Sequence, residues 1–256
     1  MQLWSAAVSD VGTKKKVNQD TVMLKIAGSP YGRIGLAVVC DGVGGLKKGE
    51  LASVTMLQDA ENWFMEALPL VLESSDREQA VCESLLEMTG RTDKKLKNYM
   101  ADTGEQLGTT ISLLLVIDRQ YYILNVGDTR VYLHNGTKLQ QITRDHTWIQ
   151  NEIDSGRLTE AEAENSPDRN VLLQCVGASE TLHPDFMTGR VEEETVFLVC
   201  SDGFRHVLTK EELEKEVNPQ SFASERKMED RLKNMVKTIK ARKEKDNISA
   251  ILIKTF

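Results

Sequence analysis

The order of short apolar runs and long helical patterns constrains the fold more than any other feature of the sequence. Apolar residues at helical spacing predict helices over 50–72, 77–100 and 225–243. Six runs rich in β-branched and aromatic residues, bounded by Gly, Asp or Asn, predict strands. These runs are 35–40, 111–117, 121–126, 131–134, 195–200 and 248–253. Because helices and strands do not alternate strictly, the pattern favours an α+β fold with helices layered on largely antiparallel sheet.

Composition limits the class of protein. The chain has 256 residues, 40% of them hydrophobic, which is enough for a proper core and excludes intrinsic disorder. No apolar run reaches the length of a membrane span, and the first ten residues carry no basic region of a secretion signal. A net charge of -7 makes nucleic acid a poor partner. The four cysteines form no CxxC pair, so we expect a reducing cytoplasm.

The segment 144–190 differs from the rest of the chain. It is polar, contains Gly156, Pro167, Gly177 and Pro184, and has one short helical pattern over 148–155. We expect an excursion from the sheet. A mobile, flap-like cover and a packed surface insertion both fit this pattern.

Four aspartates stand at the ends of predicted strands. Asp41, Asp128 and Asp202 follow strands, Asp246 precedes one, and each adjoins Gly or Asn. If these strands are neighbours, the carboxylates converge, and their repulsion calls for a cation. Hard oxygen ligands favour Mg²⁺ or Mn²⁺ over Zn²⁺. Each Asp-Gly or Gly-Asp pair alone is more typical of a turn than of a metal ligand.

These aspartates belong to a longer series of motifs that resembles the metal-dependent protein phosphatases, the type 2C serine/threonine phosphatases in their bacterial form. The series covers nearly the whole chain, so we expect one catalytic domain over 1–256. No single motif is specific, but their order is. The motifs are Ser9-Asp10-Val11-Gly12, Asn18-Gln19-Asp20, Asp41-Gly42-Val43-Gly44-Gly45, Gly108-Thr109-Thr110, Gly127-Asp128-Thr129-Arg130, Asp145-His146-Thr147, Ser201-Asp202-Gly203 and Asp246-Asn247-Ile248-Ser249.

The resemblance implies a four-layer α-β-β-α sandwich with two central antiparallel sheets. It also implies two or three Mn²⁺ or Mg²⁺ ions at one end of the sandwich. By position, Asp41 would bridge two ions and the carbonyl of Gly42 would contribute to one. Asp202 and Asp246 would hold the first ion.

Two further aspartates take roles by the same resemblance. Asp20 would support the second ion, directly or through water. Asp128 would belong to a weaker third site, with Asp202 shared. The preference between Mn²⁺ and Mg²⁺ stays open, because both accept octahedral oxygen sites.

The implied activity is hydrolysis of phosphoserine and phosphothreonine in proteins by a metal-activated bridging water. No cysteine stands in a CxxxxxR phosphate loop, which agrees with a mechanism without a phospho-enzyme. Lys15 stands where relatives usually carry a phosphate-binding arginine, and Lys14 or Lys16 are alternatives to it. Val43 replaces a histidine of some eukaryotic relatives. His146 is expected to be structural, at the base of the excursion, and His134, His183 and His206 to be surface or satisfied residues.

Two alternatives stay open at this point. A phosphatase fold with weak turnover could serve to bind phosphoproteins, and a hydrolase on the same fold could act on a small phosphoester. The expected partners are phosphorylated proteins and an opposing serine/threonine kinase, with no nucleic acid and no membrane. We expect a monomer.

Overall fold

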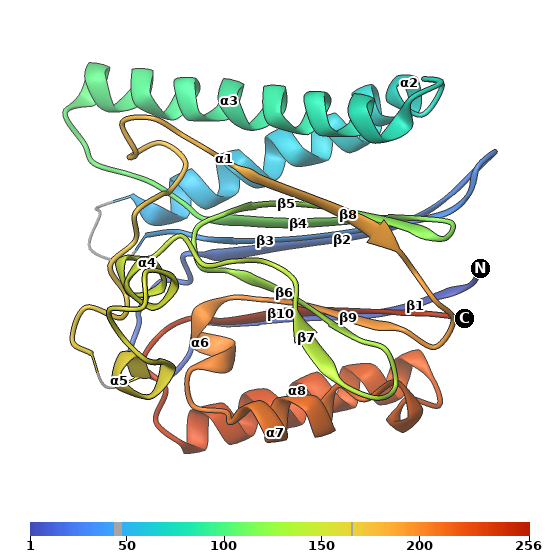
Figure 1. Ribbon diagram of the computed structural model, residues 1–256. Helices are drawn as coiled ribbons and strands as arrows, with labels where there is room; N and C mark the ends of the chain where they lie inside the picture. Colours follow the sequence, from blue (N-terminus) through green and yellow to red (C-terminus); the bar gives the residue numbers. More distant parts are fainter. Residues whose placement is uncertain (44–47, 165) are drawn as a thin grey trace.

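A computed structural model describes residues 1–43, 48–164 and 166–256. Within these residues, two five-stranded antiparallel sheets lie face to face between outer helices (Figure 1). The first sheet has the order β1 (Leu3–Asp10), β10 (Ile248–Thr255), β9 (Val196–Cys200), β6 (Arg130–His134) and β7 (Leu139–Gln141). The second has the order β2 (Asp20–Ser29), β3 (Gly32–Asp41), β4 (Ile111–Ile117), β5 (Gln120–Val126) and β8 (Asp185–Arg190). The α+β, four-layer sandwich implied by the resemblance is confirmed.

The inner strands are buried on both faces. In β3, Leu36 and Val38 pack in the core beneath the helices, whereas Ala37 and Val39 pack between the two sheets. This alternation is the two-residue period of a strand. Because both faces meet apolar layers, such a strand is apolar throughout, which is why it appears in the sequence as a continuous run.

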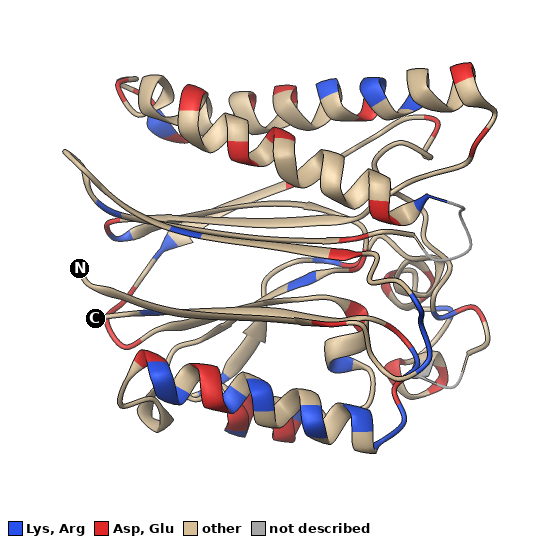
Figure 2. Ribbon diagram, turned by 180° about the vertical axis from the view of Figure 1, so that it is seen from behind, with Lys and Arg blue, Asp and Glu red and all other residues tan. Residues whose placement is uncertain are grey.

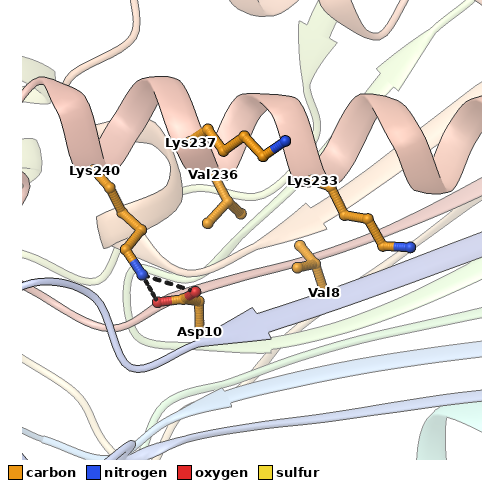
Figure 3. Close-up of a pocket in the computed structure, with 6 residues that line it drawn as sticks. All are labelled: Val8, Asp10, Lys233, Val236, Lys237 and Lys240. Carbon is orange, nitrogen blue, oxygen red and sulfur yellow. Dashed lines mark hydrogen bonds and ion pairs between the residues drawn. The ribbon is translucent and has the colours of Figure 1, made fainter.

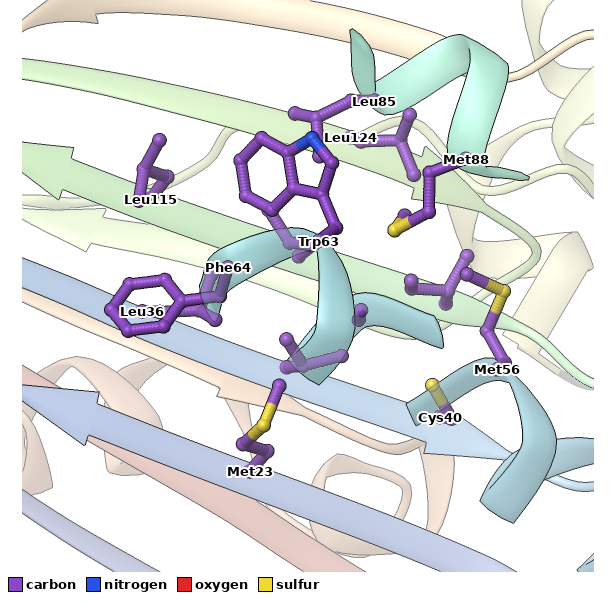
Figure 4. Close-up of a cluster of buried hydrophobic side chains, with 14 of the residues drawn as sticks. Met23, Leu36, Cys40, Met56, Trp63, Phe64, Leu85, Met88, Leu115 and Leu124 are labelled. Carbon is purple, nitrogen blue, oxygen red and sulfur yellow. The ribbon is translucent and has the colours of Figure 1, made fainter. Parts of the chain in front are cut away.

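The first helical layer covers the second sheet. It comprises α1 (Gly49–Asn62), a π-helical turn (Trp63–Ala67), α2 (Leu68–Val71) and α3 (Arg77–Thr103). The predicted helix over 50–72 is therefore confirmed, with a π turn ahead of Pro69, whose nitrogen has no hydrogen to donate. Trp63 and Phe64 lie in the core beneath α3 (Figure 4), where Trp63 Nε1 donates to Ser84 Oγ (2.6 Å).

The second helical layer covers the first sheet. It contains α6 (Asp202–Arg205), α7 (Lys210–Glu216), a 3₁₀ turn (Pro219–Ser221) and α8 (Glu225–Ala241). The predicted apolar stripe of α8, which includes Met228, Leu232 and Ile239, is fully buried against this sheet. No helix among the described residues combines the length and the apolar character that crossing a bilayer requires.

The six predicted strands are the inner strands of the two sheets, and the four strands that the sequence pattern missed are the edges. The edge strands are β1, β7, β2 and β8. An edge strand meets fewer apolar neighbours, so its sequence is less apolar. β8, for example, has no fully buried residue, whereas every residue of β4 is buried.

The polar segment after β7 contains α4 (Trp148–Asp154) and α5 (Glu160–Glu164). Its last six residues form β8, so the sheet resumes before the expected end of the excursion. The backbone closes on itself at its base, where the N–H of Trp148 donates to the carbonyl of Val171 (2.9 Å).

Candidate functional site

Five aspartates from both sheets meet at the end of the sandwich far from the chain termini, where acidic positions gather (Figure 2). Asp20 opens β2 and Asp41 closes β3, and the two residues face each other in the register of that strand pair. Asp202 follows β9, Asp246 precedes β10 and Asp128 precedes β6. β6, β9 and β10 are adjacent in the first sheet. The convergence expected from the strand ends is therefore present.

Four carboxylates of the cluster, those of Asp20, Asp41, Asp128 and Asp202, have a raised pKa. Burial raises the pKa of Asp20 to about 7, and the neighbouring Asp202 adds to the rise against hydrogen bonds from Ser249 and Ser201. Burial and Asp202 raise the pKa of Asp128 to about 7, with Arg205 opposing. Removal from water and four surrounding aspartates hold the pKa of Asp41 well above its usual range. Such a cluster needs protons or cations to balance its charge.

Two oxygens in the cluster have no partner. Asp20 Oδ2 and Asp202 Oδ1 are buried and accept no hydrogen bond from any described residue. A buried acceptor without a partner is costly, and a cation would satisfy it. Among the described residues, no three His, Cys, Asp or Glu side chains are already arranged to hold an ion. Carboxylate oxygens are the ligands that Mg²⁺ and Mn²⁺ prefer, so the chemistry of the cluster fits these ions. The side chains would have to adjust when an ion binds.

Two glycines allow the loops around Asp246 to approach closely. Gly12 has a φ of +79°, and a Cβ there would lie 2.2 Å from the carbonyl oxygen of Asp246. A Cβ on Gly203 would lie 2.2 Å from the carbonyl oxygen of Asn247. Only glycine fits at these contacts, so the loops carrying Asp202 and Asp246 pack backbone against backbone.

The side chain of Asn247 joins two segments of the site through three hydrogen bonds. Its Oδ1 accepts from the N–H of Gln19 (2.9 Å), and its Nδ2 donates to the carbonyls of Val11 (2.9 Å) and Val17 (3.2 Å). This buried amide fixes the loop between β1 and β2 against the start of β10. That loop carries Lys15, so Asn247 sets where Lys15 stands.

Lys15 stands at the edge of the cluster. Its Nζ lies 2.8 Å from Asp246 Oδ1, and about a third of its side chain is exposed. Partial burial opposes its charge, but Asp246, Asp41 and Asp202 outweigh that effect and raise its pKa. Lys15 is thus a charged ammonium group within reach of both solvent and the carboxylates.

Asp128 has a cation of its own. Arg205 Nη2 donates to the carbonyl of Asp128 (3.2 Å) and lies 3.8 Å from its Oδ2. The same nitrogen contacts Asp145 (3.4 Å), which also holds Arg130 through two short contacts of 2.7 and 2.6 Å. Although burial disfavours its charge, the two arginines lower the pKa of Asp145. Arg205 therefore links Asp128 to the buried ion pair at the base of the excursion.

His146 has the structural role expected for it. Its Nδ1 accepts from the N–H of Gly127 (3.2 Å), and its Nε2 lies 3.0 Å from Asp185 Oδ2. The backbone N–H of His146 donates to the carbonyl of Gly127 (2.9 Å). The ring therefore fixes the loop before Asp128 to the start of β8.

No sequence motif assigned a place beside the cluster to Arg205, Glu244 or His206. His206, expected as a surface or satisfied residue, has partners: its Nε2 lies 3.5 Å from Asp202 Oδ2 and its Nδ1 3.9 Å from Glu244 Oε2. Burial lowers its pKa to about 4, so the ring is neutral. The four-residue step from Asp202 to His206 at a short helix was the available signal.

The motif after Asp41 is described in part. The N–H of Gly42 donates to the carbonyl of Gln19 (3.1 Å), and that of Val43 to the carbonyl of Gly108 (2.9 Å). Gly44 and Gly45 lie outside the described residues.

We predict that the metal-free protein becomes less stable as pH rises. The raised pKa values mean that the folded state binds more protons than the unfolded state between about pH 4 and pH 7. The lowered pKa of His206 acts in the opposite direction between about pH 4 and pH 6.5, but it is one group against four raised carboxylates, so stability is lost as pH rises across the window. With chelator present, we expect a melting temperature about 5 °C lower at pH 8 than at pH 5.5.

Asp41→Asn should reduce this pH dependence because it removes one of the repelling charges. The exposed Asp102→Asn is the matched control and should leave it unchanged. Equal melting temperatures at the two pH values in the chelated wild type would contradict the prediction.

Comparisons with known proteins identify the family and the fold of this chain. The protein phosphatase 2C family model matches residues 12–253. The protein phosphatase PhpP of Streptococcus pneumoniae is 29% identical over 206 residues, which are 80% of each chain. The serine/threonine phosphatase Stp1 of Staphylococcus aureus has a similar structure, with a TM-score of 0.85, 25% identity, and coverage of 100% of this chain and 96% of that one.

A further solved structure, the catalytic domain of the serine/threonine protein phosphatase PstP in complex with two manganese ions, shares the fold. Its TM-score is 0.76 at 21% identity, with 98% of this chain and 97% of that one covered. The family model spans nearly the whole chain and includes all five aspartates of the cluster. This chain belongs to the protein phosphatase 2C family.

Proposed function

We propose that this chain hydrolyses phosphoserine and phosphothreonine in proteins with the help of two or three Mn²⁺ or Mg²⁺ ions at its aspartate cluster. Membership of the family makes it a protein serine/threonine phosphatase. The observation that carries the metal site is the pair of buried, unpartnered oxygens on Asp20 and Asp202 among carboxylates of raised pKa. The solved structure of the PstP catalytic domain with two manganese ions also supports a metal site in this fold.

The proposed ligands are those that the resemblance assigned. Asp41 would serve two ions, helped by the carbonyl of Gly42, while Asp202 and Asp246 would hold the first ion. The central place of Asp41, whose pKa responds to all four other aspartates, supports this assignment.

Asp20 and Asp128 complete the proposed set. Asp20 faces Asp41 across the β2–β3 pair, which suits a ligand of the second ion. Asp128 would serve a third and weaker site with Asp202. The nearby guanidinium of Arg205 partly balances Asp128 and is a reason for weak binding there.

When bound, the ions supply an acidified water and neutralise charge on the phosphate. The protein supplies an additional cation. Asp246 holds Lys15 in the structure, and an Asp246 carboxylate engaged by an ion would leave the ammonium group of Lys15 free. Lys15 would then bind a phosphate oxygen as a point charge, with less control of orientation than an arginine fork gives.

We propose a single domain over 1–256 in which the excursion between β7 and β8 forms a flap beside the site. Its base is fixed by Asp145 and His146, close to Asp128. Beyond that base, Trp148, Val171 and Leu173 leave apolar surface exposed. Such surface could contact the polypeptide on either side of a phosphorylated residue.

The proposed partners are phosphorylated proteins and the kinase whose products they are. We also propose that the protein is a monomer of the cytoplasm. A reducing compartment suits its free cysteines, of which Cys40, Cys175 and Cys200 are buried.

Asp202→Asn is predicted to abolish metal-dependent turnover. The substitution keeps the shape of the side chain but removes the charge that holds the ion, so kcat/KM should fall about 100-fold or more. The assay compares p-nitrophenyl phosphate and a phosphothreonine peptide with Mn²⁺, Mg²⁺ or chelator. The exposed Asp230→Asn should keep wild-type activity.

Two results of that assay would contradict the proposal. Wild-type protein that binds metal but hydrolyses neither substrate would be a phosphoprotein-binding module. Turnover of small phosphoesters without turnover of phosphopeptides would point to a small-molecule hydrolase.

Lys15→Ala is predicted to raise the KM of the phosphothreonine peptide about tenfold with little change in kcat, because a charged contact to phosphate is lost. Lys15→Arg should restore the KM. Isothermal titration should show Mn²⁺ affinity unchanged or tighter in Lys15→Ala, since Asp246 then has no competing ammonium group. Weaker Mn²⁺ binding would instead make Lys15 a support of the metal site.

Trp148→Ala combined with Val171→Ser and Leu173→Ser should reduce activity on the phosphopeptide about tenfold and spare p-nitrophenyl phosphate, because these are exposed apolar side chains of the flap. The backbone bridge between Thr147 and Leu172, which holds the base of the flap, is left in place. The two kcat/KM values are the measurement. Equal loss on both substrates would argue against a flap that contacts the polypeptide.

A further inference from the structure

A groove lies between α8 and the edge strand β1, on the outer face of the first sheet (Figure 3). Its volume is about 450 Å³. Lysines line it on the helix side and two valines form its apolar part. The lining residues are Val8, Asp10, Lys233, Val236, Lys237 and Lys240.

The groove is a basic feature on an acidic protein. The chain has a net charge of -7, yet α8 places three lysines along this one groove. Lys237 has no ion pair with any described residue, and Lys233 has only a 3.6 Å contact with Glu229, with both side chains more than half exposed. Two ammonium groups are therefore available to a ligand, and an exposed helical pair of this kind holds its lysine weakly.

One end of the groove is joined to the aspartate cluster by a series of direct contacts between residues. Lys240 Nζ binds both carboxylate oxygens of Asp10, at 2.7 and 3.0 Å. Asp10 Oδ1 accepts from the N–H of Gly12 (2.8 Å), and Gly12 packs on the carbonyl of Asp246. Asp246 is the partner of Lys15. The Lys240 end of the groove is therefore three contacts away from Asp246, and a polypeptide that extends past Lys240 would approach that end of the molecule.

The strand beside the groove can accept an extended chain. β1 is the edge of its sheet and, among the described strands, pairs with β10 alone. Near the start of β1, the N–H of Ser5 donates to Glu225 Oε1 (3.0 Å), which closes that end. The part of β1 around Val8 and Asp10 stays open toward the groove. An open edge with side-chain pockets along it is a common platform for extended peptides.

We propose that this groove docks an acidic segment of the phosphoprotein substrate, next in sequence to the phosphorylated residue. This inference rests on the proposed phosphatase function and adds to it a preference for acidic flanking sequence. Carboxylates of the segment would pair with Lys233 and Lys237, and its apolar groups would cover Val8 and Val236. A recessed groove with an apolar floor beside an open strand edge suits a polypeptide better than a membrane surface.

Binding is tested first, independently of turnover. The probe is a fluorescein-labelled, unphosphorylated peptide with five Asp or Glu residues beside a threonine, and its partner carries Asn and Gln instead. Fluorescence anisotropy should show that the wild type prefers the acidic peptide. Lys233→Glu with Lys237→Glu should weaken that binding at least fivefold, whereas the matched pair Lys94→Glu with Lys95→Glu on α3 should not. The preference should fade at high salt.

Three results of this arm would overturn the proposal. They are equal binding of the two peptides by the wild type, an equal effect of the two double variants, and loss of binding to phosphatidylserine vesicles in the groove variant with peptide binding intact. The last result would assign the groove to an anionic membrane.

Turnover is tested second, with phosphothreonine peptides that carry the same two flanks. The groove variant should raise the KM of the acidic peptide five- to tenfold, with kcat and the hydrolysis of p-nitrophenyl phosphate unchanged. An unchanged KM would overturn the proposal. Absence of turnover on every substrate by wild-type protein would refute the phosphatase function instead, and the anisotropy result would still decide whether the groove binds acidic peptides.

Discussion

The mutual repulsion of five aspartates at one end of the sandwich is the constraint on which the rest of the site depends. The strands place Asp20 and Asp41 opposite each other, and the loops of the first sheet bring Asp128, Asp202 and Asp246 beside them. Water would screen these charges, but three of the five side chains are buried. Lys15 and Arg205 balance part of this negative charge. Two oxygens, Asp20 Oδ2 and Asp202 Oδ1, have no partner among the described residues and are available to a cation. A bound ion would relieve the repulsion between the carboxylates. The free energy that this repulsion costs the metal-free protein therefore contributes to the affinity of the cluster for metal.

The inner part of the fold could be predicted from the sequence, and the edges could not. A strand packed on both faces, such as β4, is apolar at every position and stands out from its surroundings. β1 and β8 each pack against fewer neighbours, and their mixed sequences resemble those of loops. The π turn before Pro69 is likewise a local adjustment that periodicity does not show. The layers follow from the hydrophobic pattern, whereas the edges follow from tertiary contacts.

The candidate site was predictable for a different reason. Four of its carboxylates adjoin Gly or Asn beside the predicted inner strands, and this pairing was visible without exact strand ends. Asp20 opens β2, which the pattern missed, so only the resemblance pointed to it. The residues that tune them are Arg205, which ends a four-residue helix, and His206, which follows it, and so short a helix gives no periodic signal. Asn247 was visible as part of a motif, but its bonds reach residues about 230 positions away, which no local pattern reveals. The sequence therefore identifies the carboxylates of the cluster, and the structure identifies the side chains that orient them.

The most direct test of the account is the anomalous diffraction of crystals soaked in Mn²⁺, collected at the manganese absorption edge. We expect peaks between Asp41 and the carboxylates of Asp20, Asp202 and Asp246, with Lys15 displaced from Asp246. A third and weaker peak beside Asp128 would agree with the partial balance that Arg205 provides there. Crystals that show no peak within this cluster, or that place manganese elsewhere on the chain, would contradict the claim that the five aspartates form a metal centre.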